Sequence, residues 1–444
     1  MKLKALCAAL TCAGCINPAL VFATNGMDME GYGPVATALG GTSFAYDNGT
    51  AAMMNNPATL ALMPRNSSRL DLAAGYLGPN VETSYGGMNA KSLADKFYSP
   101  AFGWVSKKNS WTYGIGIYGQ GGMGTEYDGT SFMSAGSGRT ARSELGVGRV
   151  LFPVAMDVSP NFSVGGTFDI VWAQMDMQMP LETTQIGAMQ GLGLVSFSGA
   201  MAGALGGMAA GDVAYIDFSD NNRFSGKAKA AGYAGKIGFT YKLSSRLSVG
   251  GTYHSRTRLS DMEATDASLS IIKAGGTTAV MNGTMTIKNF QWPDTYGLGV
   301  AFQASEQLML AADYKRIGWK NVMQSFQMTF IDGASGSDLN IAFPQNWEDQ
   351  NVVMLGVSYK TTPALTLRAG LNLSNNPVPD YYMNALFPAI EKNHLTVGFG
   401  YAFRKASAVD FALSYAPKVE ATNAMGQSVS HSQVNGQFMY SYRF

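Results

Sequence analysis

Three residues near position 255 are of types that could perform catalysis together. His254, Ser255 and Asp261 supply a base, a hydroxyl nucleophile and a carboxylate, the combination that attacks acyl groups in many hydrolases. Closeness along the chain does not make a triad, because the three roles depend on geometry in the folded protein. No group of His, Cys or acidic residues has the spacing of metal ligands. We therefore expect no enzyme, no metal and no cofactor.

The composition narrows the class of protein. Only 14% of the 444 residues are charged, whereas an ordinary soluble domain has about 25%. The mean hydropathy is near zero, which disfavours the long apolar runs of a helical membrane bundle. Basic and acidic residues number 31 and 30, without a block of like charge, so we expect no nucleic-acid partner.

Residues 1–23 have the pattern of a secretory signal peptide. Lys2 and Lys4 form a basic start, an apolar stretch follows, and small or apolar residues precede a cleavage after Ala23. All three cysteines lie in this segment, so we expect no disulfide in the exported chain. Lipid attachment at Cys15 is the alternative; it is disfavoured because Cys12 stands where such sites usually have Leu.

From about Arg69 to the end, apolar residues alternate with a period of two, as in strands that present alternate side chains to opposite faces. Grouping these segments by the short polar turns between them gives fourteen strands of about ten residues, joined alternately by short and long connections. A closed barrel of such strands satisfies every backbone group within lipid. We therefore predict an all-β fold, a 14-stranded antiparallel transmembrane β-barrel in the outer membrane of a Gram-negative cell.

A soluble β-sandwich would also show alternation and glycine-rich turns. It is disfavoured because aromatic residues such as Trp104, Trp111 and Tyr113 crowd the strand ends, as they do at membrane interfaces. The last strand ends in an aromatic face that is similar to outer-membrane assembly signals, formed by Phe438, Tyr440, Tyr442 and Phe444. We expect the barrel-assembly machinery to recognise it.

Two segments do not fit the alternation. Residues 24–66 are rich in Gly, Ala, Asn and Pro and are too few for a separate domain, so we expect them to pack inside a barrel formed by residues 67–444. Residues 183–211 are uncharged, and we favour short helices in an extracellular loop over a membrane helix. Long extracellular loops are expected near 121–142, 181–222, 259–284 and 331–349.

The N-terminal segment contains Gly31-Tyr32-Gly33, then Gly40 and Gly41, and then Asn56-Pro57-Ala58. This series resembles the start of the FadL/TodX (OmpP1) family of outer-membrane transporters of long-chain fatty acids and hydrocarbons. The resemblance extends to residues 118–127 (YGQGGMGTEY), which look like the kinked third strand of that family. The resemblance implies that residues 24–66 form a hatch, with Gly40, Gly41, Asn56, Pro57 and Ala58 among its characteristic residues.

The same resemblance implies passive uptake of hydrophobic molecules, which are caught by loops, held in a pocket and released sideways through the kink at Gly119, Gly121, Gly122 and Gly124. Long-chain fatty acids or related hydrocarbons are the implied substrates. An aromatic-hydrocarbon channel of the same family and a general porin remain alternatives. We further expect contacts with the lipid bilayer and lipopolysaccharide, and a monomer.

The pocket candidates lie on the fifth predicted strand and just above the seventh. Met175, Met177 and Met179 share the lumen-side parity, and methionine adapts to varied apolar shapes; packing beneath the loops is the alternative role. Family members tend to have a basic residue where Gln174 stands, so recognition of a carboxylate is in question. Arg256 could replace that basic residue, as could Arg258, Lys315 or Arg316, although we favour solvated charges at strand ends as the role of these four residues.

Overall fold

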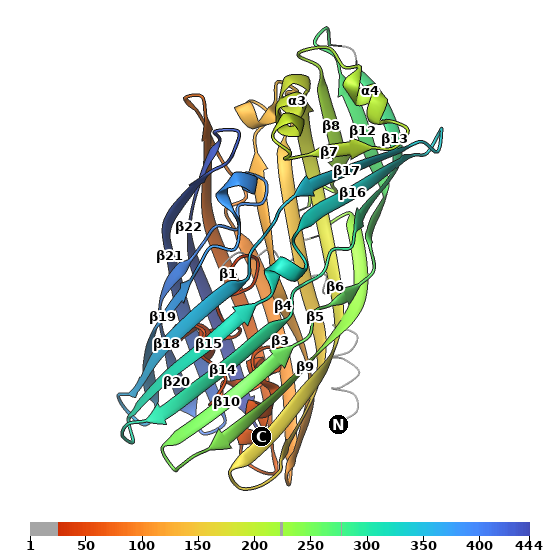
Figure 1. The fold of residues 1–444 in the computed structure, drawn as a ribbon. Helices are drawn as coiled ribbons and strands as arrows, with labels where there is room; N and C mark the ends of the chain where they lie inside the picture. Colours follow the sequence, from red (N-terminus) through yellow and green to blue (C-terminus); the bar gives the residue numbers. More distant parts are fainter. Residues whose placement is uncertain (1–24, 223–224, 277) are drawn as a thin grey trace.

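The structure of the protein, a computed structural model, describes residues 25–222, 225–276 and 278–444. The predicted signal peptide and the alternative lipid attachment site at Cys15 lie outside the described residues. The described chain forms a tall, closed β-barrel whose sheet extends above one side of its mouth (Figure 1).

Fourteen strands of the barrel wall are antiparallel and pair each with the next around the ring, and two more, described below, complete its upper part. In ring order they are β1 (Ser67–Tyr85), β3 (Phe97–Lys108), β4 (Trp111–Tyr127), β5 (Ala141–Asp157), β6 (Phe162–Glu182), β9 (Ala228–Lys242), β10 (Leu247–His254), β14 (Thr295–Gln303), β15 (Leu308–Ile317), β18 (Gln350–Lys360), β19 (Leu365–Ser374), β20 (Asn393–Arg404), β21 (Ser407–Thr422) and β22 (Ser428–Arg443). The ring closes where β1 pairs with β22, from Arg69↔Arg443 to Ser84↔Ser428.

The prediction of fourteen strands is wrong, because the closed ring of paired strands passes through sixteen. Two further strands, β8 (Val213–Phe218) and β12 (Met262–Ile272), stand between β6 and β9 in the upper wall. β8 pairs with the upper end of β6, β12 pairs with β8, and β12 reaches β9 at Glu263↔Lys229. Lower down, β6 and β9 pair directly from Phe162 to Met175, so the two inserted strands belong only to the upper wall.

The two inserted strands were not predicted because apolar and polar residues alternate only weakly in them. Residues Val213 to Ile216 of β8 are all buried, and a strand that is covered on both faces has no polar side to produce a period of two. In β12 the register shifts between Ala264 and Ala267, which moves later residues to the opposite face.

The segments expected as long loops contain further paired strands above the membrane-spanning wall. β13 (Thr278–Lys288), β16 (Ser325–Asp332), β17 (Asp338–Pro344) and β7 (Ser196–Ser198) pair in that order and extend the sheet beyond β12. Two short helices, α3 (Thr183–Gly191) and α4 (Ala202–Gly206), lie within residues 183–211. Among the described residues, no helix is long and apolar enough to cross a membrane.

The remaining short elements lie in turns and in the N-terminal segment. They are β2 (Met88–Lys91), β11 (Arg258–Leu259), α2 (Pro34–Ala38), η1 (Gly49–Met53), η2 (Pro57–Leu62), η3 (Phe132–Ser134), η4 (Trp319–Asn321) and η5 (Asp380–Tyr382).

The two faces of the wall differ as the alternation predicts. Apolar side chains on the outer face are open to the surroundings, with Ile237 64% and Leu298 63% exposed, as expected of a surface that lipid covers. Inward-facing positions include buried polar residues such as Asp313, Asn372 and Thr396. The aromatic residues Phe438, Tyr442 and Phe444 of the last strand are exposed on the outside, and Tyr440 is half-buried beside Phe403.

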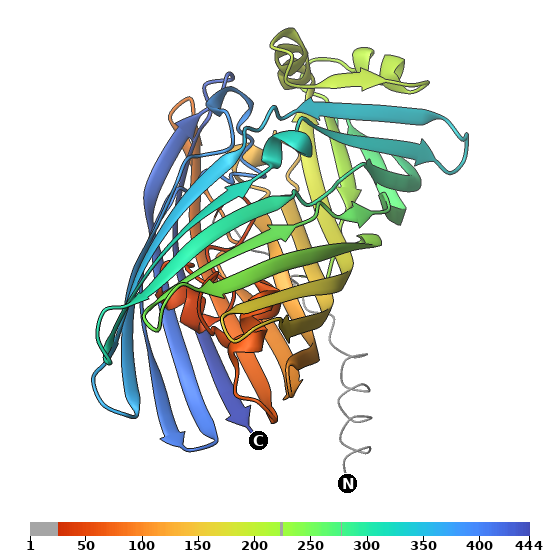
Figure 2. The same ribbon diagram turned by 60° about the horizontal axis from the view of Figure 1, so that its bottom comes forward.

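Residues 25–66, called the hatch below, fold inside the barrel (red in Figure 2). α2, η1 and η2 are buried, and the segment is hydrogen-bonded to the surrounding wall. The backbone N–H groups of Ser43 and Phe44 donate to Asp313 Oδ2 of β15 at 2.6 and 3.0 Å. These contacts fix the hatch against the inner wall.

Candidate functional site

An apolar cavity, called the inner cavity below, lies within the barrel between the hatch and the mouth. Its lining is mainly methionine and aromatic: Met27, Met123, Leu145, Met175, Met177, Met179, Phe290, Met323, Phe326, Phe343, Gln345, Trp347, Asn384 and Phe387. Its free volume is about 20 Å³, close to what one water molecule needs. A larger ligand fits only if the lining moves, and unbranched methionine side chains can do so readily.

A second space, called the outer cleft below, opens at the mouth above the inner cavity. It has a volume of about 170 Å³ and is formed by loop residues from several connections, among them Phe132, Leu194, Tyr382 and Met425. Met179, Phe343, Gln345 and Asn384 line both spaces. These four residues therefore form the wall between the outer cleft and the inner cavity.

β4 bends inward at the glycines singled out in the sequence. Its pairing with β5 has a bulge between Gly119 and Gly121, and its pairing with β3 ends at Phe102↔Ile117. The chain before β3 meets β4 again at Leu93, whose N–H donates to Glu126 O at 2.7 Å. Residues 118–125 of β4 are thus separated from β3, which leaves a break in the wall beside the bulge.

The hatch takes up hydrogen bonds that β3 would otherwise make with β4. Gly122 N–H donates to Met27 O at 3.0 Å, and Asp28 forms a bridge with Gly121. A Cβ atom added at Gly121 would overlap Met27 O and the ring of Trp292. Glycine is required here because the hatch backbone approaches so closely.

Four buried polar side chains, called the latch below, hold this junction: Asp28, Tyr32, Gln120 and Lys315. Gln120, the extra residue of the bulge, donates from Nε2 to Asp28 Oδ1 at 2.8 Å, and the Tyr32 hydroxyl donates to the same oxygen at 2.6 Å. Lys315 Nζ, from β15 across the barrel, lies 3.0 Å from Asp28 Oδ2. Burial and then the charge of Asp28 raise the pKa of Tyr32 well above its usual value, so its hydroxyl keeps the proton that it donates.

A small cavity, called the exit cavity below, lies on the far side of the latch. Its volume is about 30 Å³, and small residues such as Ala73, Gly75, Ser99 and Gly119 form much of its lining. Met27 and Met123 face the inner cavity, while Tyr32 and Gly119 face the exit cavity. The latch therefore stands between the inner cavity and the break in the wall.

The hatch residues singled out in the sequence form its contacts with the barrel. Asn56 precedes η2 and accepts from Ala58 N–H at 3.1 Å, with Pro57 at the first helical position. Its Nδ2 donates to Phe44 O at 2.7 Å and to Phe239 O of β9 at 3.0 Å. Gly40 has a φ of 71° and lies directly against the backbone of β19, where a side chain would not fit.

Three of the five predicted pocket candidates line the inner cavity, and two do not. Met175, Met177 and Met179 line the inner cavity, as their lumen-side parity predicts. Gln174 pairs with Gly146 and Lys229 in the wall and does not line the cavity, and Arg256 is exposed. Lys315 belongs to the latch, Arg316 is exposed and pairs with Asp349, and Arg258 is exposed beside the ring of Tyr233.

Sequence reasoning missed the latch. Gln120 was visible as a lone amide among glycines, and Asp28 as an acidic residue in a segment that has to be buried. Neither signal reveals the partner, because Lys315 lies hundreds of residues away and only the closed barrel brings it to Asp28.

The residues considered for catalysis do not form a triad. His254 Nε2 lies 2.7 Å from Asn55 O of the hatch, Ser255 Oγ accepts from Gly235 N–H, and Asp261 accepts from Asn289 N–H. Each of them has a separate structural contact. No group of three or more His, Cys, Asp or Glu side chains in the described part of the chain could hold a metal ion.

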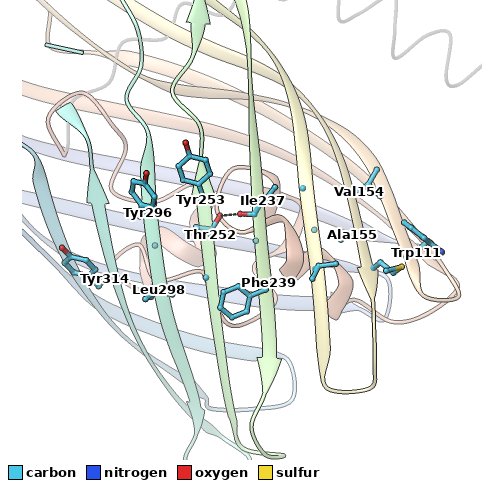
Figure 3. Close-up of a pocket in the computed structure, with 17 residues that line it drawn as sticks. Trp111, Val154, Ala155, Ile237, Phe239, Thr252, Tyr253, Tyr296, Leu298 and Tyr314 are labelled. Carbon is cyan, nitrogen blue, oxygen red and sulfur yellow. Dashed lines mark hydrogen bonds between the residues drawn. The ribbon is translucent and has the colours of Figure 1, made fainter. Parts of the chain in front are cut away.

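A further hollow lies on the lipid-facing outside of the wall, not in the lumen. It is a groove of about 850 Å³ lined by residues such as Ile237, Phe239, Leu298 and Tyr296 (Figure 3). Gly166 and Gly251 deepen the groove, because a side chain at either position would point outward and fill it. Lipid chains cover this face in a membrane, so we assign the groove to the lipid-facing surface.

A membrane barrel whose lumen holds a folded hatch, with an apolar cavity beside a break in the wall, has the architecture of a channel for hydrophobic compounds. The sequence profile of the family described as outer membrane protein transport protein (OMPP1/FadL/TodX) matches residues 10–441. The chain belongs to this family of outer-membrane transport channels. The predicted family and the location as a multi-pass β-barrel of the outer membrane are thereby confirmed.

Solved structures of two toluene transporters are similar over almost the whole chain. TodX of Pseudomonas putida is 31% identical with a TM-score of 0.85, covering 94% of this chain and 99% of that one. TbuX of Ralstonia pickettii is also 31% identical, with a TM-score of 0.78 and coverage of 94% and 99%. A FadL homologue of Pseudomonas aeruginosa, 16% identical with a TM-score of 0.68 over 96% and 99% of the chains, shows the fold alone.

The curated relatives match over shorter stretches. Outer membrane protein P1 of Haemophilus influenzae is 26% identical over 204 residues, which is 45% of this chain and 41% of that protein. The chain thus spans less than half the length of that relative.

Proposed function

We propose that the protein is a passive channel for uncharged hydrophobic molecules of about the size of a monoaromatic hydrocarbon. The observation that carries the proposal is the inner cavity, whose described lining consists of methionine, aromatic and other uncharged side chains. The similarity to proteins described as toluene transporters supports the same substrate class.

The proposed route runs from the outer cleft through the inner cavity to the exit cavity, and then sideways into the membrane beside β4. Such a route keeps the molecule away from water, where each additional CH₂ group costs about 0.8 kcal/mol relative to an apolar site. The flexible methionine lining allows ligands of different shapes to occupy a cavity that is almost closed without them.

A long-chain fatty acid would bring a carboxylate into the inner cavity. Among the described lining residues no basic side chain faces it, and Lys315 is already paired with Asp28. An isolated carboxylate in an apolar site is strongly disfavoured, so the uncharged substrate is the better match. A general porin would need an open aqueous lumen, whereas here the hatch occupies it.

A matched pair of charge substitutions tests this proposal. Met177→Arg places a charge in the inner cavity, while Gln174→Arg places the same charge three residues away and outside its lining. In cells that lack other such channels, Met177→Arg should lower uptake of labelled toluene by about tenfold or more, and Gln174→Arg should leave uptake nearly unchanged.

Folding of both variants is checked by heat-dependent migration in gels, and labelled palmitate is measured beside toluene. Full toluene uptake in folded Met177→Arg would contradict a route through the inner cavity. Uptake of palmitate but not toluene by the unaltered protein would contradict the proposed substrate class.

A further inference from the structure

The connection between β19 and β20, residues 378–392, folds into the mouth of the barrel and is called the inner loop below. Although it joins two strands at the extracellular end, most of its middle is buried, as shown by Met383, Leu386, Ala389 and Ile390. Surface connections are usually exposed, so burial of this one indicates that it belongs to the interior of the channel.

Side chains of the wall hold the backbone of the inner loop. The Tyr127 hydroxyl donates to Ala385 O at 3.0 Å, and Thr125 Oγ1 donates to Leu386 O at 3.1 Å. From other strands, Ser143 Oγ donates to Leu386 O, and a nitrogen of His431 lies 3.1 Å from Pro388 O. Thr125 and Tyr127 stand on β4 directly above the kink.

The inner loop separates the two upper spaces. Asn384 lines both the outer cleft and the inner cavity, and Phe387 lines the inner cavity alone. The ring of Phe387 packs on that of Phe326, with centroids 5.8 Å apart. The inner loop thus contributes Asn384 to the wall between the two spaces, and Phe387 stands just inside that wall, among the residues that line the inner cavity.

The end of the inner loop rests near the hatch. Glu391 is buried, and its Oε1 lies 3.3 Å from Nε2 of His431. Glu30 of the hatch is also buried, and its charge contributes to a raised pKa of Glu391, although burial is the larger cause. One buried carboxyl group of the inner loop and one of the hatch thus lie close enough for their charges to interact.

From this placement we propose that the inner loop is the size-selective barrier between the outer cleft and the inner cavity, with Phe387 as its specificity-determining residue. The proposal rests on the proposed function for the class of molecule that passes, and adds which residue limits its size. The inner loop is held by hydrogen bonds to its carbonyl groups and by the contact of Phe387 with Phe326. It can therefore move aside without any backbone hydrogen bond between strands of the wall being broken.

Access to the inner cavity can be measured without transport. The cysteines of the chain lie at positions 7, 12 and 15, so replacing them with Ser and adding Met175→Cys gives one reactive thiol in the cavity lining. We expect Phe387→Ala to raise the rate at which N-ethylmaleimide modifies this thiol by about tenfold, as followed by mass spectrometry of the folded protein in mild detergent.

Tyr381→Ala is the matched control, because Tyr381 is an exposed aromatic residue of the same loop that lines neither space. It should leave the modification rate within about twofold. Phe387→Leu provides a milder variant in case the alanine variant does not fold, and should give an intermediate rate. Equal rates in the unaltered, Phe387 and Tyr381 proteins would overturn the proposal.

Uptake supplies the second measurement, with toluene and the larger naphthalene as probes. Phe387→Ala should raise naphthalene uptake relative to toluene, whereas an unchanged ratio in the folded variant would contradict a size limit at Phe387. If the unaltered protein takes up neither probe, the proposed function fails, and the modification rates still decide whether the inner loop is a barrier.

Discussion

The inner loop and the latch close the two ends of the inner cavity with different chemistry. Above the cavity, neutral hydroxyl groups bind loop carbonyls and Phe387 packs on Phe326. Below it, a buried carboxylate, Asp28, is held by Tyr32, Gln120 and Lys315. A hydrogen bond between neutral groups contributes about 0.5–1.5 kcal/mol net to folding stability, whereas a hydrogen bond to a charged group contributes about 1.5–3 kcal/mol.

This difference indicates that the two barriers do not open equally easily. Moving the inner loop exposes neutral groups that water or neighbouring residues can satisfy. Opening the latch strands a buried charge, which is costly unless another partner replaces the first. We infer that the upper barrier selects by size, while the lower barrier opens at the greater free-energy cost along the proposed route.

The largest expected effect comes from removing the lower barrier altogether. Deleting residues 25–66 takes away Asp28, Tyr32 and the whole hatch, which should leave a folded barrel with a wetted lumen. Permeability to small hydrophilic solutes should rise by about tenfold or more, since no constriction remains at that level. Conductance in planar bilayers measures this, and a folded truncated protein that conducts like the intact one would show that the hatch is not a plug.

A smaller but still large effect is expected from Asp28→Ala. It leaves Lys315 buried without its carboxylate, which should lower the free energy of unfolding by about 3–5 kcal/mol. Asp28→Asn keeps an oxygen that can accept from Tyr32 and Gln120, so its free energy of unfolding should fall less than that of Asp28→Ala. Denaturant unfolding in detergent checks both variants.

The matched control for the latch is Asp349→Ala, which breaks the ion pair of the neighbouring residue Arg316 on the exposed side of β15. Exposed ion pairs contribute little to folding stability, so Asp349→Ala should lower the free energy of unfolding much less than Asp28→Ala. Equal losses in the two variants would mean that the latch has no special role in stability.

The smallest effect is expected from Glu391→Gln at the end of the inner loop. Burial, and secondarily the charge of Glu30, raise the pKa of Glu391 well above its ordinary value of 4.5. The folded protein therefore binds this proton more tightly than the unfolded chain, and stability falls as pH rises above about 4.5 towards the raised pKa. Glu391→Gln should reduce that fall between about pH 5 and pH 8, as measured by denaturant unfolding at both pH values.

Glu420→Gln, which alters an exposed carboxylate of β21, is the control for this pH dependence and should leave it unchanged. A pH dependence of equal slope in the unaltered and Glu391→Gln proteins would contradict the assignment. Such a result would also mean that Glu391 is not held neutral in the inner loop. The contrast between a neutral upper barrier, the inner loop, and a charged lower barrier, the latch, would then be lost.

The wall of the barrel was predictable because lipid covers one face of each strand and imposes a period of two. That regularity also predicted that Met175, Met177 and Met179 share a face. It failed for β8, whose two faces are both covered, and the strand count was wrong for this reason. The bend at Gly119 and Gly121 was implied by the family resemblance, and glycine suits it because glycine tolerates the close approach of another backbone.

The contacts that close the cavity were not predictable from the sequence. The pairing of Asp28 with Lys315 and the inward fold of residues 378–392 depend on closure of the ring, which brings distant segments together. Gln174 was singled out by the family resemblance, and in the structure it pairs with Gly146 and Lys229 in the wall.

The length of β6 has a consequence for where the channel begins. Its 21 residues span about 70 Å at roughly 3.3 Å per residue, or about 50 Å of height after a tilt of about 40°, against an apolar band of about 25 Å. About half of that height therefore lies outside the hydrocarbon, so the wall is much taller than the apolar layer around it. Because the mouth stands at the far end of this wall from the hatch, we propose that the upper wall leads an apolar molecule past the polar surface of the membrane before it reaches the break in β4.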